Sequence, residues 1–246
     1  MEPRLIPGSP AWWAARPRTP AAAAEAPRRG RPPVDFGRIV AIALRLVDEV
    51  GVQAFTLRML ADALGSGTAT LYRHFAGKDE LLVHVVDHVL GDVGTPAPGS
   101  TATWRESLTA VADALYLTLR RHPHVLPLLI AQVPIGPNGL AQRERVLQLL
   151  LTHGFPADLA ARAFTAVSHY VIGFAAQQHG PGSADPDSAP ALAAFYRGLD
   201  TATYPAITTA ARTLTRTPLD EEFRFGLALL VTGLEHLVDG HPPQAP

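Results

Sequence analysis

Residues 55–82 read FTLRMLADALGSGTATLYRHFAGKDELL, and this stretch decides the fold. Thr56 is predicted to cap a helix over 57–64, in which apolar residues repeat at helical spacing. A glycine-containing turn over 65–67 leads to a second helix, predicted over 68–75. Two short helices joined in this way form a helix-turn-helix, whose second helix enters a DNA major groove about 12 Å wide. Small helical bundles contain the same arrangement without binding DNA, so the pattern alone leaves that question open.

Helices are also predicted on both sides of this stretch. Apolar residues between Phe36 and Val50 recur at the helical period, which predicts a helix that Gly51 terminates. Downstream, a longer helix is predicted from Lys78 to about Leu90. Together these elements predict a three-helix DNA-binding domain over residues 34–80.

The N-terminal residues 1–33 are rich in Pro, Ala and Arg and show no helical stripe, which predicts a disordered arm. The arm has no continuous apolar core of signal-peptide length, and no later stretch reaches roughly 18 uninterrupted apolar residues. These features predict a soluble, cytoplasmic protein. Arg28, Arg29 and Arg31 either reach a phosphate or minor groove beside the domain, or only keep the tail soluble.

The remainder of the chain is predicted to form a second helical domain over residues 81–240. A segment rich in Gly, Pro, Thr and Ser over 91–101 separates it from the head. The expected fold class is therefore all-α, with an N-terminal helix-turn-helix domain joined to a helical bundle, and 180–190 is expected to be a mobile loop. Helices are predicted near 102–121, 123–132, 138–153, 156–179, 189–213 (broken near Tyr204 and Pro205) and 218–238.

Composition excludes several classes of protein. The 246 residues include no cysteine, which rules out a disulfide scaffold, a cysteine zinc site, a thiol nucleophile and an iron–sulfur cluster. The net charge is −1, so binding to nucleic acid must depend on local charge. Residues 28–78 carry eight basic against four acidic side chains, whereas residues 79–246 carry ten basic against sixteen acidic ones. A basic head on an acidic body is expected where only the head meets phosphate.

The region over residues 35–91 resembles the DNA-binding domain of the TetR family of transcriptional repressors. Ser66 and Gly67 depart from the usual pattern, which has an apolar turn residue and a Ser-type N-cap there. The resemblance implies a repressor that binds a near-palindromic operator as a homodimer. The matching features are the Gly51 break, Thr56-Leu57-Arg58, Leu60-Ala61, Leu64-Gly65, Thr70-Leu71-Tyr72-x-His74-Phe75 and Lys78.

The resemblance implies base contacts by Arg58 and by the start of the recognition helix. A guanidinium can bond O6 and N7 of a guanine together, which makes Arg58 the predicted base reader; the alternative is a solvated surface arginine. Thr68, Ala69 and Thr70 open the recognition helix, where side chains face base edges, and Ala69 suits a thymine methyl. The alternative for each is a simple capped helix start.

Phosphate contacts are implied for three further residues. Tyr72 and His74 carry donors suited to phosphate oxygens, although a histidine at this spacing is often a packing residue. Lys78 stands at a helix N-terminus, where a cation opposes the helix dipole unless an outside group such as a phosphate compensates it.

The second domain resembles, more weakly, the tetracycline-repressor type of C-terminal domain. The matching segments are THGFPADLAARAFTAVSHYVIGF at 152–174 and the C-terminal TYPAITTAARTL…DEEFRFGLALLVTGLEHL. The resemblance implies that helices containing 167–174 and 219–238 pair across a two-fold axis; the alternative is packing within one chain. Ile130 and Gln177 fall where magnesium-supporting side chains stand in the tetracycline-bound relative, and they are poor ligands for that cation. No metal or cofactor is expected, and His122 with His124 around Pro123 does not predict one.

A small-molecule cavity is expected among the helices of the body. Its predicted lining is apolar and aromatic with few polar groups and no basic residue, which suits a small, largely apolar effector that releases the repressor from DNA. The alternatives are a constitutive helix-turn-helix regulator or a protein-binding adaptor. No enzyme is expected, because the chain lacks GxSxG, P-loop, GxGxxG and HExxH motifs. The predicted lining residues are Tyr116, His122, Leu126, Ile130, Val133, His169, Phe174 and Gln177.

Overall fold

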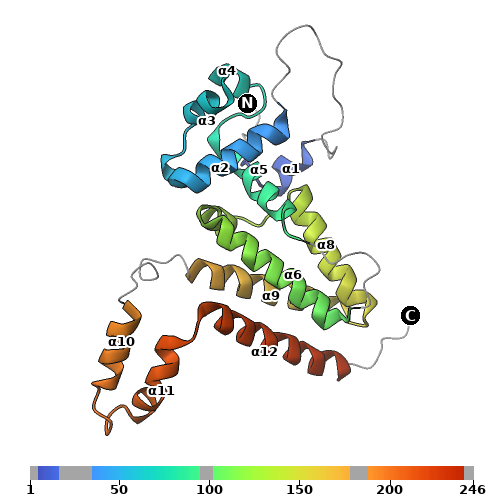
Figure 1. Ribbon diagram of the computed structural model, residues 1–246. Coiled ribbons are helices and arrows are strands. Elements are labelled where there is room, and N and C mark those ends of the chain that lie inside the picture. The colour runs from blue at the N-terminus through green and yellow to red at the C-terminus, as the bar shows by residue number, and fades with distance from the viewer. Residues whose placement is uncertain (1–4, 17–34, 95–101, 178–187, 241–246) are drawn as a thin grey trace.

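The computed structural model describes residues 5–16, 35–94, 102–177 and 188–240, and every regular element within these ranges is a helix (Figure 1). The predicted fold class, an N-terminal helix-turn-helix head on a helical body, is confirmed. The expected loop over 180–190 lies largely outside the described residues. The helices are α1 Pro10–Ala14, α2 Phe36–Ala54, α3 Leu57–Leu64, α4 Thr68–Leu71, α5 Lys78–Gly91, α6 Trp104–Arg121, η1 (a 3₁₀ turn) Pro123–Val125, α7 Leu126–Ala131, α8 Pro137–Thr152, α9 Ala157–Gln177, α10 Ser188–Arg197, α11 Pro205–Arg216 and α12 Leu219–Asp239.

In the N-terminal domain, called the head, helix α2 packs on α3 and α5. Its N-terminus is capped by Asp35, whose carboxylate accepts from the backbone N–H of Arg38. Its buried stripe includes Ile39, Ala43 and Val47. The predicted end of the regular helix at Gly51 is confirmed: Gly51 takes a non-helical φ of 78°, and a short further turn follows to Ala54.

The two helices of the helix-turn-helix are α3 and α4. Thr56 caps α3 as predicted, and Gly65 ends it in the left-handed conformation with a φ of 60°. Helix α4 covers only Thr68–Leu71, so the predicted helix over 68–75 is too long. Gly67 supplies no side-chain cap, and the N–H groups of residues 74 and 75 bond back to the carbonyl of Leu71 in turns.

The body is a bundle in which α9 packs on α6, α8 and α12. Helix α5 belongs to both parts, because it packs on α2 in the head and on α8 in the body. The α10–α11 hairpin projects from the bundle, with its two helices packed on each other (Figure 1). The predicted break near Tyr204 and Pro205 is confirmed, because α11 begins at Pro205 and residues 198–204 separate it from α10.

The N-terminal segment over 5–16 differs from the expected disordered arm. Ser9 caps α1, and the indole of Trp12 is only 3% exposed. Both Trp12 and Trp13 pack on the ring of His84 in α5, and Arg16 forms an ion pair with the buried Glu80. Two adjacent indoles bury enough apolar surface to dock a segment whose average composition resembles a disordered tail. Arg28, Arg29 and Arg31 lie outside the described residues.

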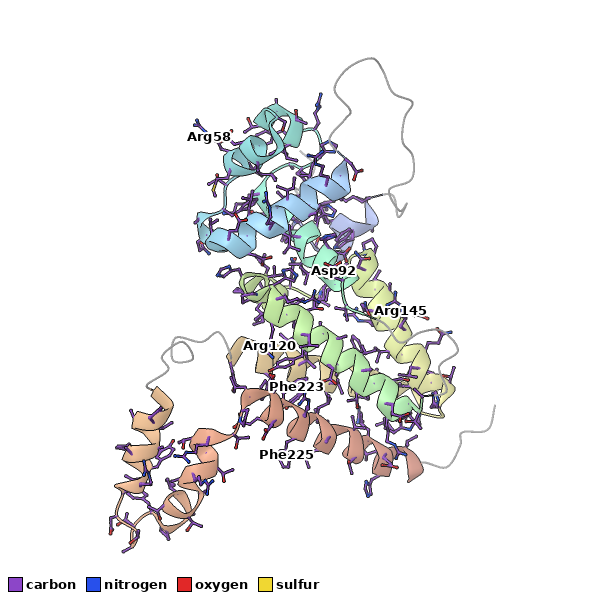
Figure 2. The ribbon with its side chains drawn as sticks, in the orientation of Figure 1. Arg58, Asp92, Arg120, Arg145, Phe223 and Phe225 are labelled. Atoms are coloured by element: carbon purple, nitrogen blue, oxygen red, sulfur yellow. The ribbon has the colours of Figure 1, made fainter. Side chains whose placement is uncertain are left out.

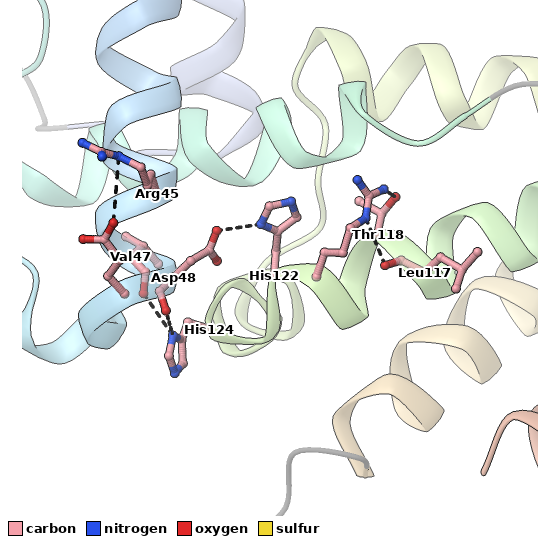
Figure 3. A network of polar contacts seen from close by, with 9 residues as sticks. Arg45, Val47, Asp48, Leu117, Thr118, His122 and His124 are labelled. Atoms are coloured by element: carbon pink, nitrogen blue, oxygen red, sulfur yellow. Dashed lines mark hydrogen bonds and ion pairs between the residues drawn. The ribbon is translucent and has the colours of Figure 1, made fainter. Parts of the chain in front are cut away.

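Polar contacts from the body reach the end of α2 in the head (Figure 3). His122 follows α6, and its Nδ1 lies 2.7 Å from an Asp48 carboxylate oxygen. The ring of His124 in η1 lies 3.0 Å from the carbonyl oxygen of Val47. These contacts fix the head on the body, and they place His122 at the junction.

Candidate functional site

The outer surface of the head is formed by α3 and α4. Leu60, Leu64 and Leu71 are buried beneath it and hold the two helices together. Arg58 is exposed on α3 and points away from the body at the outer end of the molecule (Figure 2). A guanidinium presented in this way is free to reach base edges.

The first residues of α4 share this surface. Thr68, Ala69, Tyr72 and His74 are exposed, with Tyr72 at 60%. Thr70 is half-buried, and its hydroxyl accepts from Arg73 at 3.4 Å. Arg73 was not predicted to contact DNA, although it is an exposed cation between two residues that were, Tyr72 and His74. Its position between Tyr72 and His74 in the sequence could have predicted that it also contacts DNA.

Lys78 has a different environment from the one predicted. Its ammonium donates to the carbonyl oxygens of Val52 at 2.7 Å and Phe55 at 2.6 Å, and the residue is half-buried. These carbonyls at the end of α2 supply the negative partner that was expected to come from a phosphate. In the free protein, Lys78 therefore ties α5 to the segment before α3.

The body contains a cavity of about 840 Å³, which is the size of a drug-like ligand site. It lies between the end of α5 and helices α6 to α9. Its wall is mainly branched aliphatic, and the aromatic ring of Phe164 also lines it. The lining includes Leu90, Val93, Leu108, Val111, Leu115, Ile130, Val133, Gln142, Arg143, Val146, Phe164, Ser168 and His169.

Three of the eight predicted lining residues, Ile130, Val133 and His169, line this cavity. The other five lie elsewhere. His122 is at the junction with the head, Leu126 is in the core, and Gln177 is exposed at the last position of α9.

Tyr116 and Phe174 belong to an aromatic cluster between α6, α9 and α12. The rings of Tyr116 and Phe223 stack at 3.9 Å with an interplanar angle of 8°. The Tyr116 hydroxyl donates to Asp220 at 3.2 Å, and Arg120 pairs with the same carboxylate at 2.7 Å. The prediction failed here because helical spacing cannot distinguish a cavity wall from a face covered by α12.

Two polar residues of the cavity wall, Gln142 and Arg143, were not predicted. The expectation that no basic residue lies in the lining is therefore wrong. The buried residues Gly139 and Val146 were the available signal, since positions 142 and 143 are three or four residues from each. That spacing places both side chains on the inner stripe of α8.

A helix-turn-helix with an exposed arginine, carried by a helical body that holds a ligand-sized cavity, defines a one-component transcriptional regulator. The profile described as "Bacterial regulatory proteins, tetR family" matches residues 39–85, and "Tetracyclin repressor-like, C-terminal domain" matches residues 95–238. The chain belongs to the TetR family of transcriptional regulators.

Individual relatives span nearly the whole chain. The HTH-type transcriptional repressor DrrR1 of Streptomyces coeruleorubidus is 31% identical over 221 residues, which cover 86% of this chain and 82% of DrrR1. The class G tetracycline repressor of Vibrio anguillarum is 29% identical and covers 83% and 95% of the two chains. The TetR family protein ActR of Streptomyces coelicolor, solved in complex with actinorhodin, is 32% identical with a TM-score of 0.76, and covers 85% and 100%.

Membership of this family makes the protein a soluble, intracellular DNA-binding regulator, and family members are not enzymes. Helix α9 is long and apolar enough to cross a membrane by length and composition alone. It packs on four other helices of the bundle, α6, α7, α8 and α12.

Proposed function

We propose that this protein is a cytoplasmic repressor that binds a near-palindromic operator as a homodimer and leaves it when a small molecule occupies the cavity. In this proposal Arg58 and the first turn of α4 read bases, while Tyr72, Arg73 and His74 contact phosphates. The head comprises residues 34–80 and the body 81–240, with α5 shared between them. No catalytic step and no metal is assigned to the protein.

The observation that carries the proposal is the position of the cavity at the end of α5. Leu90 near the end of α5 and Val93 just after it line the cavity, and α5 begins in the head at Lys78. A ligand that displaces the end of α5 changes the setting of both heads of a dimer relative to successive major grooves. Ligands bound by the relative ActR support a small-molecule effector for this chain as well.

The dimer is proposed to form through the outer faces of α9 and α12. Phe225 and Leu229 on α12 are 69% and 59% exposed, and Figure 2 shows Phe225 pointing away from the bundle, opposite to Phe223. Exposed apolar residues gathered on one helix face are typical of a protein interface. Gly173 on α9 and Gly233 on α12 have open space at the Cβ position, which allows a second pair of helices to approach closely.

The experiment uses DNA flanking the protein's own gene, searched for an inverted repeat and bound by the full-length protein. Light scattering is expected to show a dimer, and Leu229→Glu is expected to give a monomer that loses operator affinity. Leu214→Glu, which changes an exposed leucine of α11, is the control and is expected to stay dimeric. A wild-type monomer that binds a single half-site would overturn the proposal.

A further inference from the structure

The cavity wall contains an unusual pair of neighbours, Gln142 and Arg143, on helix α8. Their side chains contact different helices. Gln142 contacts the end of α5, and Arg143 contacts Phe164 on α9. A ligand that fills the cavity therefore meets the cationic Arg143 among mainly apolar side chains, with polar side chains of α9 such as Ser168 and His169 also in the wall.

The hydrogen bonds of Gln142 fix its orientation. Its Nε2 donates to the carbonyl oxygens of Leu90 at 3.1 Å and Val93 at 3.0 Å. Because both partners are acceptors, the amide cannot be reversed without losing these bonds. Its Oε1 is buried and has no hydrogen-bond partner among the described residues. Because this oxygen has no accessible surface, a ligand in the cavity does not reach it, and Gln142 serves to hold the end of α5.

The charge of Arg143 is also left without an acidic partner on the wall. Its guanidinium lies 5.4 Å from the centroid of the Phe164 ring, and the residue is half-buried. None of the described residues that line the cavity is an aspartate or a glutamate. A guanidinium in an apolar wall forms its strongest contact with a carboxylate, which it can bond through two parallel N–H groups.

We propose that the cavity binds an amphiphilic organic acid. The ligand has an apolar ring body and a carboxylate paired with Arg143. This inference rests on the proposed function, because it names the ligand class of the same cavity. It replaces the expectation of a ligand without an acidic group.

Isothermal titration calorimetry of the full-length protein tests the proposal with three matched probes. The parent compound is 6-hydroxy-2-naphthoate, the 6-methoxy compound lacks the hydroxyl donor, and the methyl ester lacks the charge. We expect the parent and the 6-methoxy compound, which both keep the carboxylate, to bind about tenfold more tightly than the methyl ester. Equal affinities for the three compounds, or no binding of the parent at millimolar concentration, overturn the proposal.

Three variants assign the effect to Arg143. Arg143→Met keeps an apolar stem, and it is expected to weaken the parent about tenfold while the ester changes little. Arg145→Met is the matched control, because Arg145 is an exposed arginine of α8 that does not line the cavity (Figure 2). Gln142→Met, which removes the amide that holds the end of α5, is expected to keep the preference for the acid over the ester. Equal losses in Arg143→Met and Arg145→Met contradict the assignment to Arg143.

Operator release by the same compounds, followed by fluorescence anisotropy, separates this inference from the proposed function. If the parent binds as expected but the operator stays bound, the ligand class stands and the proposed response fails. If other apolar compounds release the operator while the three probes bind equally, the response stands and the ligand class fails.

Discussion

Arg58 and Lys78 are both cations of the head, but their surroundings give them different roles. Arg58 is exposed on α3, whereas the Lys78 ammonium is held by two backbone carbonyls. An exposed guanidinium is free to read a base, while a partly buried ammonium with two acceptors serves mainly to join elements.

Replacing Arg58 with Ala is expected to cost about 1–3 kcal/mol of operator binding and to relax the preference at one base pair per half-site. The measurement is binding to operators substituted at each position. Arg145→Ala on the body is the control for loss of a positive charge. Unchanged base preference in Arg58→Ala would show that the arginine reads no base.

Lys78→Met is expected to lower the free energy of unfolding by about 1–3 kcal/mol, because the carbonyls of Val52 and Phe55 lose their donor. Arg73→Ala is the matched comparison: it is expected to weaken all DNA sequences alike and to reduce the salt slope, with little change in stability. Thermal melting and salt-dependent binding distinguish the two. If the Lys78→Met protein has normal stability and a reduced salt dependence of DNA binding, Lys78 contacts a DNA phosphate instead.

His84 is predicted to make stability depend on pH. The pKa of His84 is lowered from 6.5 to about 4, mainly by burial among aromatic rings. The charge of Glu80 raises this pKa and the charge of Arg16 lowers it, and both effects are included in the value. Between the two pKa values of 6.5 and about 4, the His84 imidazole therefore binds a proton in the unfolded chain but not in the folded protein. The free energy of unfolding is expected to fall by about 3 kcal/mol as the pH decreases from about 6.5 to about 4.

Chemical denaturation at several pH values measures this dependence, and His84→Phe should remove it while keeping an aromatic ring. The comparison with the variant cancels the contribution of Asp87, whose burial raises its pKa and which remains in both proteins. Identical pH dependence in wild type and His84→Phe would contradict this role of His84.

At the scale of the elements, the docking of α1 on α5 is the largest departure from what the sequence predicts. Trp12 is buried against His84, and the Arg16–Glu80 ion pair closes the end of the contact. Trp12→Ala is expected to cost about 3 kcal/mol, which is about 6–12 °C in Tm for a chain of this length. Ile6→Ala, which truncates an exposed residue of the same segment, is the control. Equal melting temperatures for the two variants would show that α1 does not stabilise the head.

The helices of the head could be predicted because their signals are local. Thr56 and Gly65 mark the ends of α3, and the apolar stripe of α2 has a regular period. The length of α4 could not be predicted, because it depends on how the following turn returns to Leu71. The docking of α1 depends on a partner surface on α5, which no local pattern describes.

The cavity could be predicted only in part, because its wall is set by packing between helices. Ile130 was found because the register of the family resemblance places it at the ligand site, and Val133 because it is apolar and close to Ile130 in sequence; both line the wall. Tyr116 and Phe174 were misplaced because α12 covers them. Gln142 and Arg143 were missed because polar residues on a bundle helix ordinarily face solvent.

At the scale of the whole molecule, α5 links the proposed ligand cavity to the proposed DNA-binding surface. The helix carries part of the head core at one end, and its last turn is held by Gln142 at the other. Two binding sites joined in this way must influence each other by the same factor in both directions. This reciprocity gives the account a quantitative test.

The most direct test measures operator affinity with and without a saturating cavity ligand, and ligand affinity with and without operator. The ligand is a compound whose calorimetric binding is weakened by Arg143→Met and unaffected by Arg145→Met. We expect the operator to lower the affinity for the cavity ligand, and the cavity ligand to lower the affinity for the operator, by the same factor. This factor is about 5–150-fold for an ordinary regulatory coupling. Operator affinity that stays unchanged while the cavity is saturated would contradict the central claim that occupation of the cavity releases the protein from DNA.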